Sequence, residues 1–146
     1  MKKLFYILAA ALMLLASTSC TKKMVPLYLK GTTWVYDGRD VLSVIKFNTR
    51  RTFDLDIYDH TDDEYSFTIK YRINEVKDDQ VYFEFVSISI ALGNLDDLSK
   101  EGMMTLLGKR DLEMVSTRNH WRDIMEDTRA HFNLDKNFSV SKYAKN

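Results

Sequence analysis

The chain has 146 residues, which is enough for one domain with a single hydrophobic core. Its 21 basic and 21 acidic residues balance to a formal charge of zero, so it lacks the clustered positive charge that nucleic-acid binding requires. We therefore exclude nucleic acid as a partner. The sequence also has no low-complexity segment and no internal repeat, which excludes a solenoid.

The amino terminus has the order of a secretory signal peptide. Lys2 and Lys3 precede an unbroken apolar run from Leu4 to Ala16, and small polar residues follow. The run has 13 residues, fewer than the about 20 that a membrane-spanning helix needs. It is apolar on every side, unlike an amphipathic helix of a soluble domain. We therefore expect residues 1–19 to be a signal peptide outside the fold.

The only cysteine, Cys20, follows directly in the stretch Ser17-Thr18-Ser19-Cys20. This stretch resembles a bacterial lipoprotein signal, in which cleavage makes the cysteine the first residue. The resemblance implies a diacylglyceryl group on the Cys20 thiol and an acyl chain on the new α-amino group. Each buried methylene contributes about 0.8 kcal/mol, so two or three chains hold a protein firmly at a membrane. A thiol used in this way is not available for a disulfide, for nucleophilic attack or for metal binding.

Residues 20–26 are expected to form a lipidated tether, and residues 27–146 a single β-rich domain. The six residues after Cys20 reach about 20 Å when fully extended, which keeps the domain close to the bilayer. Lipoproteins exported to the cell surface resemble one another in acidic residues after the cysteine, whereas Lys22 and Lys23 stand here. The resemblance thus implies an outer-membrane protein that faces the periplasm. The two lysines either touch anionic head groups or belong to a solvated linker.

The first expected strand opens with Gly31-Thr32-Thr33-Trp34. This opening is similar to the Gly-x-Trp signature of lipocalins and lipocalin-like envelope proteins. In that family the tryptophan closes one end of a β-barrel and ligands enter at the other end, so the resemblance implies this place for Trp34. The alternative is a core tryptophan on an ordinary first strand.

Apolar residues recur at every second position between residues 32 and 90. The clearest case is 65–74, where apolar and polar residues alternate strictly. This period is typical of antiparallel strands with one buried and one solvated face. The segment 81–90 is apolar on both faces toward its end, which indicates a bulge or additional cover. The expected strands are 41–47, 53–58, 65–74 and 81–90, with hairpin turns at 48–51 and 77–80.

Beyond residue 91 the alternation weakens. Residues 92–100 are expected to be either a loop or a short helix, and 102–107 is expected to pair with 111–117 in a further hairpin.

The period changes in residues 119–132, where apolar positions fall four, three and four residues apart, as on one face of a helix. Phe138 and Val140 are expected to begin a last short strand. The elements together predict a mainly β protein, an antiparallel up-and-down meander that closes toward a lipocalin-like barrel, with one C-terminal helix. The positions on the helix face are Trp121, Met125, Thr128 and Phe132.

A barrel of eight strands has an interior only wide enough to be filled by side chains or to hold one small ligand. The residues expected to face inward are mostly large, which favours a packed core over a roomy cavity. A ligand that does bind is expected to be a small apolar or aromatic compound. The candidate ligand-binding residues are Trp34, Phe47, Phe67, Tyr71 and Phe85.

Six acidic residues and His60 lie between Asp54 and Glu64, without a lysine or arginine. A calcium-binding loop that starts at Asp59 is excluded, because Glu64 stands where glycine is needed and Lys70 where a bidentate glutamate is needed. We interpret these acidic residues as a solvated strand face and loop that discourage edge pairing.

Asp123, Asp127 and His131 are spaced by four residues on the expected helix, and we interpret them as a solvated face rather than a metal site. The chain has no glycine-rich phosphate loop, nucleophile elbow or His-Glu-x-x-His element. We therefore expect no catalytic residue, no metal and no cofactor.

Two functions remain at this point. The first is a lipid-anchored, non-enzymatic protein of the cell envelope that binds a small apolar or aromatic ligand. The alternative is an envelope interaction module with a filled core, which recognises protein or glycan with its outer surface. An open apolar pocket of at least about 300 Å³ would favour the first function, and a filled interior beside an exposed aromatic patch would favour the second.

Overall fold

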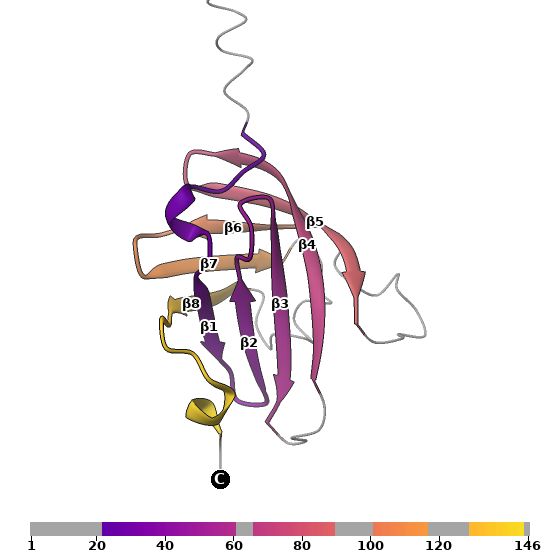
Figure 1. Cartoon of the computed structure of the whole chain (residues 1–146), viewed down its shortest axis with the longest axis vertical. Coiled ribbons are helices and arrows are strands. Elements are labelled where there is room, and N and C mark those ends of the chain that lie inside the picture. Colours follow the sequence, from indigo (N-terminus) through magenta and orange to yellow (C-terminus); the bar gives the residue numbers. More distant parts are fainter. Residues whose placement is uncertain (1–21, 61–65, 90–100, 117–128, 145–146) are drawn as a thin grey trace, which may run out of the picture.

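Eight strands form a closed antiparallel barrel in the computed structural model (Figure 1). Each strand pairs with the next one along the chain, and the last strand closes the barrel against the first. The prediction of a mainly β, up-and-down fold is confirmed. The structure describes residues 22–60, 66–89, 101–116 and 129–144. The strands are β1 (Thr33–Asp37), β2 (Val41–Lys46), β3 (Thr52–Asp59), β4 (Ser66–Lys77), β5 (Gln80–Ile88), β6 (Glu101–Leu106), β7 (Asp111–Ser116) and β8 (Arg129–Leu134).

The predicted hairpins are confirmed. Strand β2 pairs with β3 across the turn at 47–51, and β6 pairs with β7 across 107–110. Strands β4 and β5 are joined by Asp78 and Asp79. Asp78 has a φ of +53°, in the left-handed region that aspartate enters more readily than most residues. The segment 92–100 lies outside the described residues.

A bulge in β5 explains why the end of this segment is apolar on both faces. The register with β4 shifts next to Tyr71, so that Val86 becomes an extra residue between the paired positions. The side chain of Val86 is exposed, whereas Phe85 and Ile88 both pack against the core.

The predicted C-terminal helix is wrong where the structure describes it. Residues 129–134 form β8, which pairs with β7 and β1, and residues 119–128 lie outside the described part. Within β8 the exposed residues Arg129, His131 and Asn133 alternate with residues that face the core, which is a period of two. The four-residue spacings upstream hid this short alternation, and an eighth strand was needed to close the sheet.

The predicted last strand at Phe138 and Val140 is also wrong. Phe138 lies in the tail after β8 and belongs to no strand, and Val140 begins a 3-10 turn, η3 (Val140–Tyr143). A second 3-10 turn, η1 (Leu27–Leu29), precedes β1. Neither turn, nor any other helix in the described ranges, is long and apolar enough to cross a membrane.

The two ends of the barrel differ. We call the end where the chain enters the capped end; the turns at 47–51, 78–79 and 107–110 lie there as well (Figure 1). The opposite end, which we call the loop end, carries the β1–β2 turn and the connections β3–β4, β5–β6 and β7–β8, because successive turns of an up-and-down barrel alternate between its ends.

A plug closes the capped end. The side chains of Val25 and Leu29 are completely buried and belong to the barrel core. The backbone N–H of Val25 donates to the carbonyl of Arg50 (2.8 Å), and that of Gly31 donates to the carbonyl of Phe47 (2.6 Å). The segment before β1 is therefore fixed to the barrel by both apolar and hydrogen-bonding contacts.

The C-terminal tail covers the outer face of β1, β2 and β3 (Figure 1, yellow). Val35, Leu42 and Val44 point away from the barrel interior and are nevertheless buried, because Phe138 and Tyr143 pack against them. This cover explains why β2 is buried on both faces. Strict alternation along β2 alone did not predict it.

A polar clasp holds the tail. The carboxylate of Asp135 accepts hydrogen bonds from the Tyr143 hydroxyl (2.5 Å), the Lys142 ammonium (3.0 Å) and the backbone N–H of Asn137 (3.0 Å). The bond from Tyr143, followed by that from Lys142, lowers the pKa of Asp135. Burial and the same carboxylate raise the pKa of Tyr143 to about 12.

Candidate functional site

Trp34 lies in the core next to the plug. Its indole N–H donates to the hydroxyl of Thr32 (2.9 Å), and that hydroxyl donates to the carbonyl of Leu29 (2.5 Å). This chain of hydrogen bonds satisfies the indole nitrogen of a side chain that is otherwise buried among apolar groups. Trp34 is thus packed behind the capped end.

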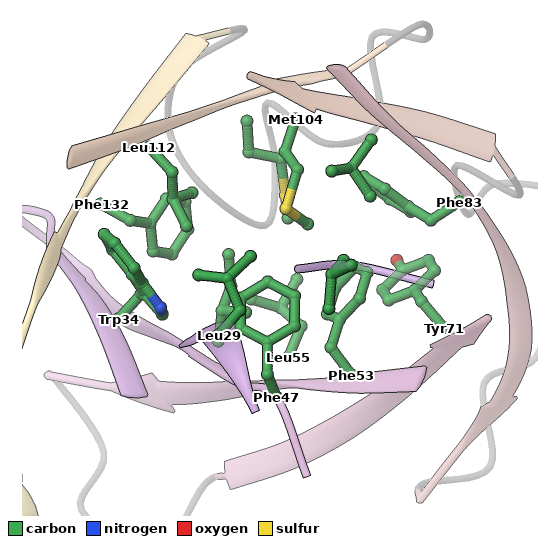
Figure 2. Packing of buried hydrophobic residues seen from close by; sticks show 14 of the residues in the cluster. Leu29, Trp34, Phe47, Phe53, Leu55, Tyr71, Phe83, Met104, Leu112 and Phe132 are labelled. Carbon is green, nitrogen blue, oxygen red and sulfur yellow. The ribbon is translucent and has the colours of Figure 1, made fainter. Parts of the chain in front are cut away.

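Phe47 and Tyr71 belong to an aromatic cluster completed by Phe53 and Phe83 (Figure 2). The ring of Phe53 lies 5.7 Å from Phe47, 5.1 Å from Tyr71 and 4.9 Å from Phe83, between centroids. Burial raises the pKa of Tyr71 well above its usual value. The labelled side chains in Figure 2 point into the space that the strands enclose, and they are buried there, so a ligand at this level has to displace packed rings.

Gly102 makes this packing possible, and sequence reasoning missed it. A Cβ at this position would lie 2.4 Å from Cζ of Phe83, so any larger residue would displace the ring. Its place in an alternating strand, at a position that faces inward, is the signal that could have indicated a close approach.

The last two predicted ligand residues, Phe67 and Phe85, lie nearer to the loop end and are only partly buried. They belong to a set of apolar side chains that pack against the core from this side and keep part of their surface exposed. The ring of Phe85 lies 6.5 Å from that of Tyr71, between centroids. Phe67 in β4 is paired with Ile57 in the neighbouring strand β3. We call this set the loop-end ring; its members are Tyr36, Val41, Phe67, Phe85 and Ile88.

Ser43 adds a polar group to the interior beside this ring. Its neighbours Leu42 and Val44 point outward, so Ser43 faces inward, in register with Tyr36 and Ile57. The hydroxyl is completely buried and has no hydrogen-bond partner within the described chain. A buried polar group without a partner destabilises a fold by about 1–3 kcal/mol.

His60 lies at the rim of the loop end. Its Nε2 is 2.8 Å from a carboxylate oxygen of Asp37, and its backbone N–H donates to the carbonyl of Asp40 (2.8 Å). His60 is therefore held by the β1–β2 turn. An activated serine requires a hydrogen bond to a base, and the unpartnered Ser43 hydroxyl does not make one with His60.

The acidic residues of β3 are paired on the outside of the barrel. Asp56 accepts a hydrogen bond from the Thr68 hydroxyl (2.6 Å) and forms an ion pair with Lys46 (2.8 Å). Asp54 accepts a hydrogen bond from the side chain of Asn48 (2.8 Å). Burial is the largest single influence on Lys46 and lowers its pKa, but the hydrogen bond to Asp56 together with the charges of Asp56, Tyr58 and Asp54 raises the pKa overall. The acids at 62–64 lie outside the described residues.

The described ranges contain no group of three or more acidic, histidine or cysteine side chains arranged for a metal ion. His131 is exposed on β8 and lies 3.2 Å from Glu113, while Asp123 and Asp127 lie outside the described residues. Cys20 lies outside them too. Comparison with protein-family models, with curated proteins and with solved structures finds no match to this chain.

Proposed function

We propose that the protein is a lipid-anchored, non-enzymatic protein of the cell envelope, lipocalin-like in form, which binds a small apolar or aromatic ligand at the loop end. The anchor is the acylated Cys20, and the protein faces the periplasm from the outer membrane. One observation carries the ligand proposal: the plug seals one end of the barrel with Val25, Leu29 and Trp34, whereas the apolar loop-end ring at the other end stays partly exposed.

The size of the ligand follows from the packing. Beneath the ring, the contacts of Phe53 with Tyr71 and Phe83 leave a ligand no room without displacement. The ligand is therefore shallow and small. The rings of Tyr36, Phe67 and Phe85 can contact an aromatic compound with their faces or edges. Aromatic pairs prefer such stacked or edge-to-face arrangements, with ring centroids about 4.5–7 Å apart.

A soluble Cys20→Ser chain tests the ligand site. Titration with an anilinonaphthalene dye should give saturable fluorescence, and Phe67→Ala should weaken the affinity about tenfold, or about 1.4 kcal/mol. The matched control is Val86→Ala, which removes an exposed side chain that does not belong to the loop-end ring. Dye binding that does not saturate, or that both substitutions weaken equally, would refute the ligand site.

The same variant tests the anchor separately. Without the thiol no diacylglyceryl group can be added, so the Cys20→Ser chain should leave the membrane fraction. Retention of this variant at the membrane, in the amount found for the unchanged protein, would refute lipid anchoring.

The interaction module remains the second candidate for two reasons: aromatic side chains pack the barrel interior, and the outer wall carries a pocket. A hollow of about 500 Å³ is lined by residues that include Tyr82, Met103 and Val115, with Glu75 and Glu101 beside them. Tyr82 is exposed enough to contact a partner. If the dye does not bind the loop end and Tyr82→Ala abolishes its binding, this outer surface is the recognition site.

A further inference from the structure

A pocket of about 590 Å³ lies at the capped end, directly beneath the incoming chain. Its basic side chains are Lys22, Arg50 and Lys77, opposed by the single carboxylate of Asp78. Neither lysine takes part in an ion pair within the part of the chain that the structure describes. The remaining lining residues, Met24, Pro26 and Val76, are apolar. A pocket lined by both basic and apolar side chains suits a phosphate group with hydrocarbon attached to it.

The pocket is built into the fold rather than formed by loose side chains. The Nε–H of Arg50 donates to the carbonyl of Val25 (2.9 Å), and the N–H of Val25 donates back to the carbonyl of Arg50. On the other side, the N–H of Val76 donates to the carbonyl of Lys22 (2.6 Å). These bonds fix the backbone of Lys22 and the stem of Arg50 in place.

Apolar side chains project from the same end. In η1, Leu29 is the completely buried plug residue, while Leu27 is 67% exposed and Tyr28 is 58% exposed. Leu107, in the β6–β7 turn, is 53% exposed. Tyrosine is enriched where protein meets the head-group region of a membrane, because its ring is apolar and its hydroxyl is polar. Exposed apolar groups beside basic ones are typical of membrane-surface contacts.

The charge of the capped end is complementary to an anionic leaflet. The segments 22–30, 48–51, 77–80 and 107–111 together contain eight basic residues and three acidic ones. Clustered basic residues next to a membrane attachment point bind acidic lipids. The basic residues are Lys22, Lys23, Lys30, Arg50, Arg51, Lys77, Lys109 and Arg110, and the acidic ones are Asp78, Asp79 and Asp111.

The chain itself brings a membrane to this surface. Cys20 is two residues before Lys22, so a fully extended backbone separates their Cα atoms by at most about 7 Å. Lys22 is already paired with Val76 at the pocket. An acyl chain on Cys20 therefore enters the bilayer close to the pocket, where head-group phosphates are at high local concentration.

We propose that the capped end is a membrane-docking surface that binds anionic phospholipid head groups in the pocket of Lys22, Arg50 and Lys77. The barrel then stands on this end, with Leu27 and Tyr28 at the head-group level and the loop-end ring directed toward water. The orientation rests on the proposed anchor at Cys20. Docking of the capped end through charge and apolar contact is a property additional to the lipid anchor.

The test uses the acylated protein in vesicles of neutral phosphatidylcholine, with or without anionic phosphatidylglycerol. Because acylation occupies Cys20, a spin label on Leu27→Cys reports one position, and a label on Val86→Cys serves as the control at another exposed position. With anionic lipid, the Leu27 label should become about fivefold less accessible to a water-soluble relaxation agent, and the Val86 label should not change.

Removal of the pocket charges should undo the effect. In the Lys22→Gln, Lys77→Gln double variant the Leu27 label should return to the accessibility found on neutral vesicles. The matched control, Arg39→Gln with Lys70→Gln, removes two positive charges from other parts of the barrel and should behave like the unchanged protein. Equal accessibility on both vesicles, or an equal effect of both double variants, would overturn the docking proposal while leaving the anchor intact.

A failed anchor gives a different result. If mass spectrometry finds Cys20 without acyl chains, the proposed lipid anchor is refuted. Docking is then tested by measuring the binding of the unacylated chain to vesicles. Binding of that chain to anionic vesicles, weakened about tenfold by the Lys22→Gln, Lys77→Gln pair, would support docking without the anchor. Absence of binding, or binding that the Lys22→Gln, Lys77→Gln pair leaves unchanged, would overturn it.

Discussion

Gly102 shows how much of the interior depends on a single residue. The ring of Phe83 occupies the space that a Cβ would need, and it packs edge-on against Phe53 (4.9 Å) and Tyr71 (5.0 Å). Gly102→Ala should therefore destabilise the protein by about 1–3 kcal/mol, because the displaced ring disturbs its neighbours. Urea unfolding measures this change. Gly108→Ala is the control, since its Cβ would meet no atom within 4 Å; equal effects of the two substitutions would contradict the packing.

For individual residues, the sequence predicted which side chains face inward but not how deeply each is buried. Alternation placed Phe47, Tyr71 and Phe85 on the inward face, and the structure agrees. It did not indicate that Phe85 keeps exposed surface while Tyr71 loses nearly all of it, because depth along the barrel depends on strand stagger and on the plug. The unpartnered hydroxyl of Ser43 was equally invisible, since its burial arises from neighbours on other strands.

At the scale of elements, η1 acts as a plug through one of its residues. Leu29 is completely buried and Leu27 is 67% exposed, although they stand two positions apart in one turn. Leu29→Ala should lower the free energy of unfolding by about 2–5 kcal/mol, as expected for a buried leucine. Leu27→Ala should change it by no more than about 0.5 kcal/mol. Similar losses for both variants, measured by chemical unfolding, would show that η1 does not seal the core.

The C-terminal tail should make stability depend on pH at both extremes. The lowered pKa of Asp135 means that its contribution is present above the usual aspartate value of about 4 and is lost as the pH falls through the lower, folded-state pKa. The raised pKa of Tyr143 means that its contribution is complete below about 10 and is lost as the pH rises toward about 12.

Tyr143→Phe isolates this effect, because it removes the hydroxyl that donates to Asp135 and keeps the ring that packs on the outer face. We expect a loss of about 1 kcal/mol at neutral pH and a shallower decline between pH 10 and 12 than in the unchanged protein. Thermal unfolding across the pH range measures both. A decline of the same steepness in the two proteins would mean that Tyr143 is not the group responsible.

Element types were predictable where the alternation was long, and not where it was short. The ten residues of 65–74 predicted β4 correctly, whereas the six of β8 were obscured by helix-like spacings before them. Short segments carry too few residues to distinguish a period of two from a period of 3.6, and pairing with β7 and β1 decides the outcome. The two-sided burial of β2 was unpredictable for a similar reason, because the covering tail comes from the far end of the chain.

At the scale of the whole molecule, the two ends of the barrel differ. The chain arrives at a sealed, basic end, and a partly exposed apolar ring lies at the other. An anchor at the first end and a ligand site at the second would keep the ligand entrance away from the membrane. The sequence indicated both an anchor and a barrel, but their relative orientation required the topology.

The most direct test of this account is to map, by the chemical-shift changes of aromatic and methyl groups, where a small aromatic probe such as indole contacts the Cys20→Ser chain. We predict changes at Phe67, Phe85 and Ile88, with Phe47 and Phe53 unaffected. Changes confined to Tyr82 and Met103 on the outer wall, or no saturable change at the loop end, would contradict it.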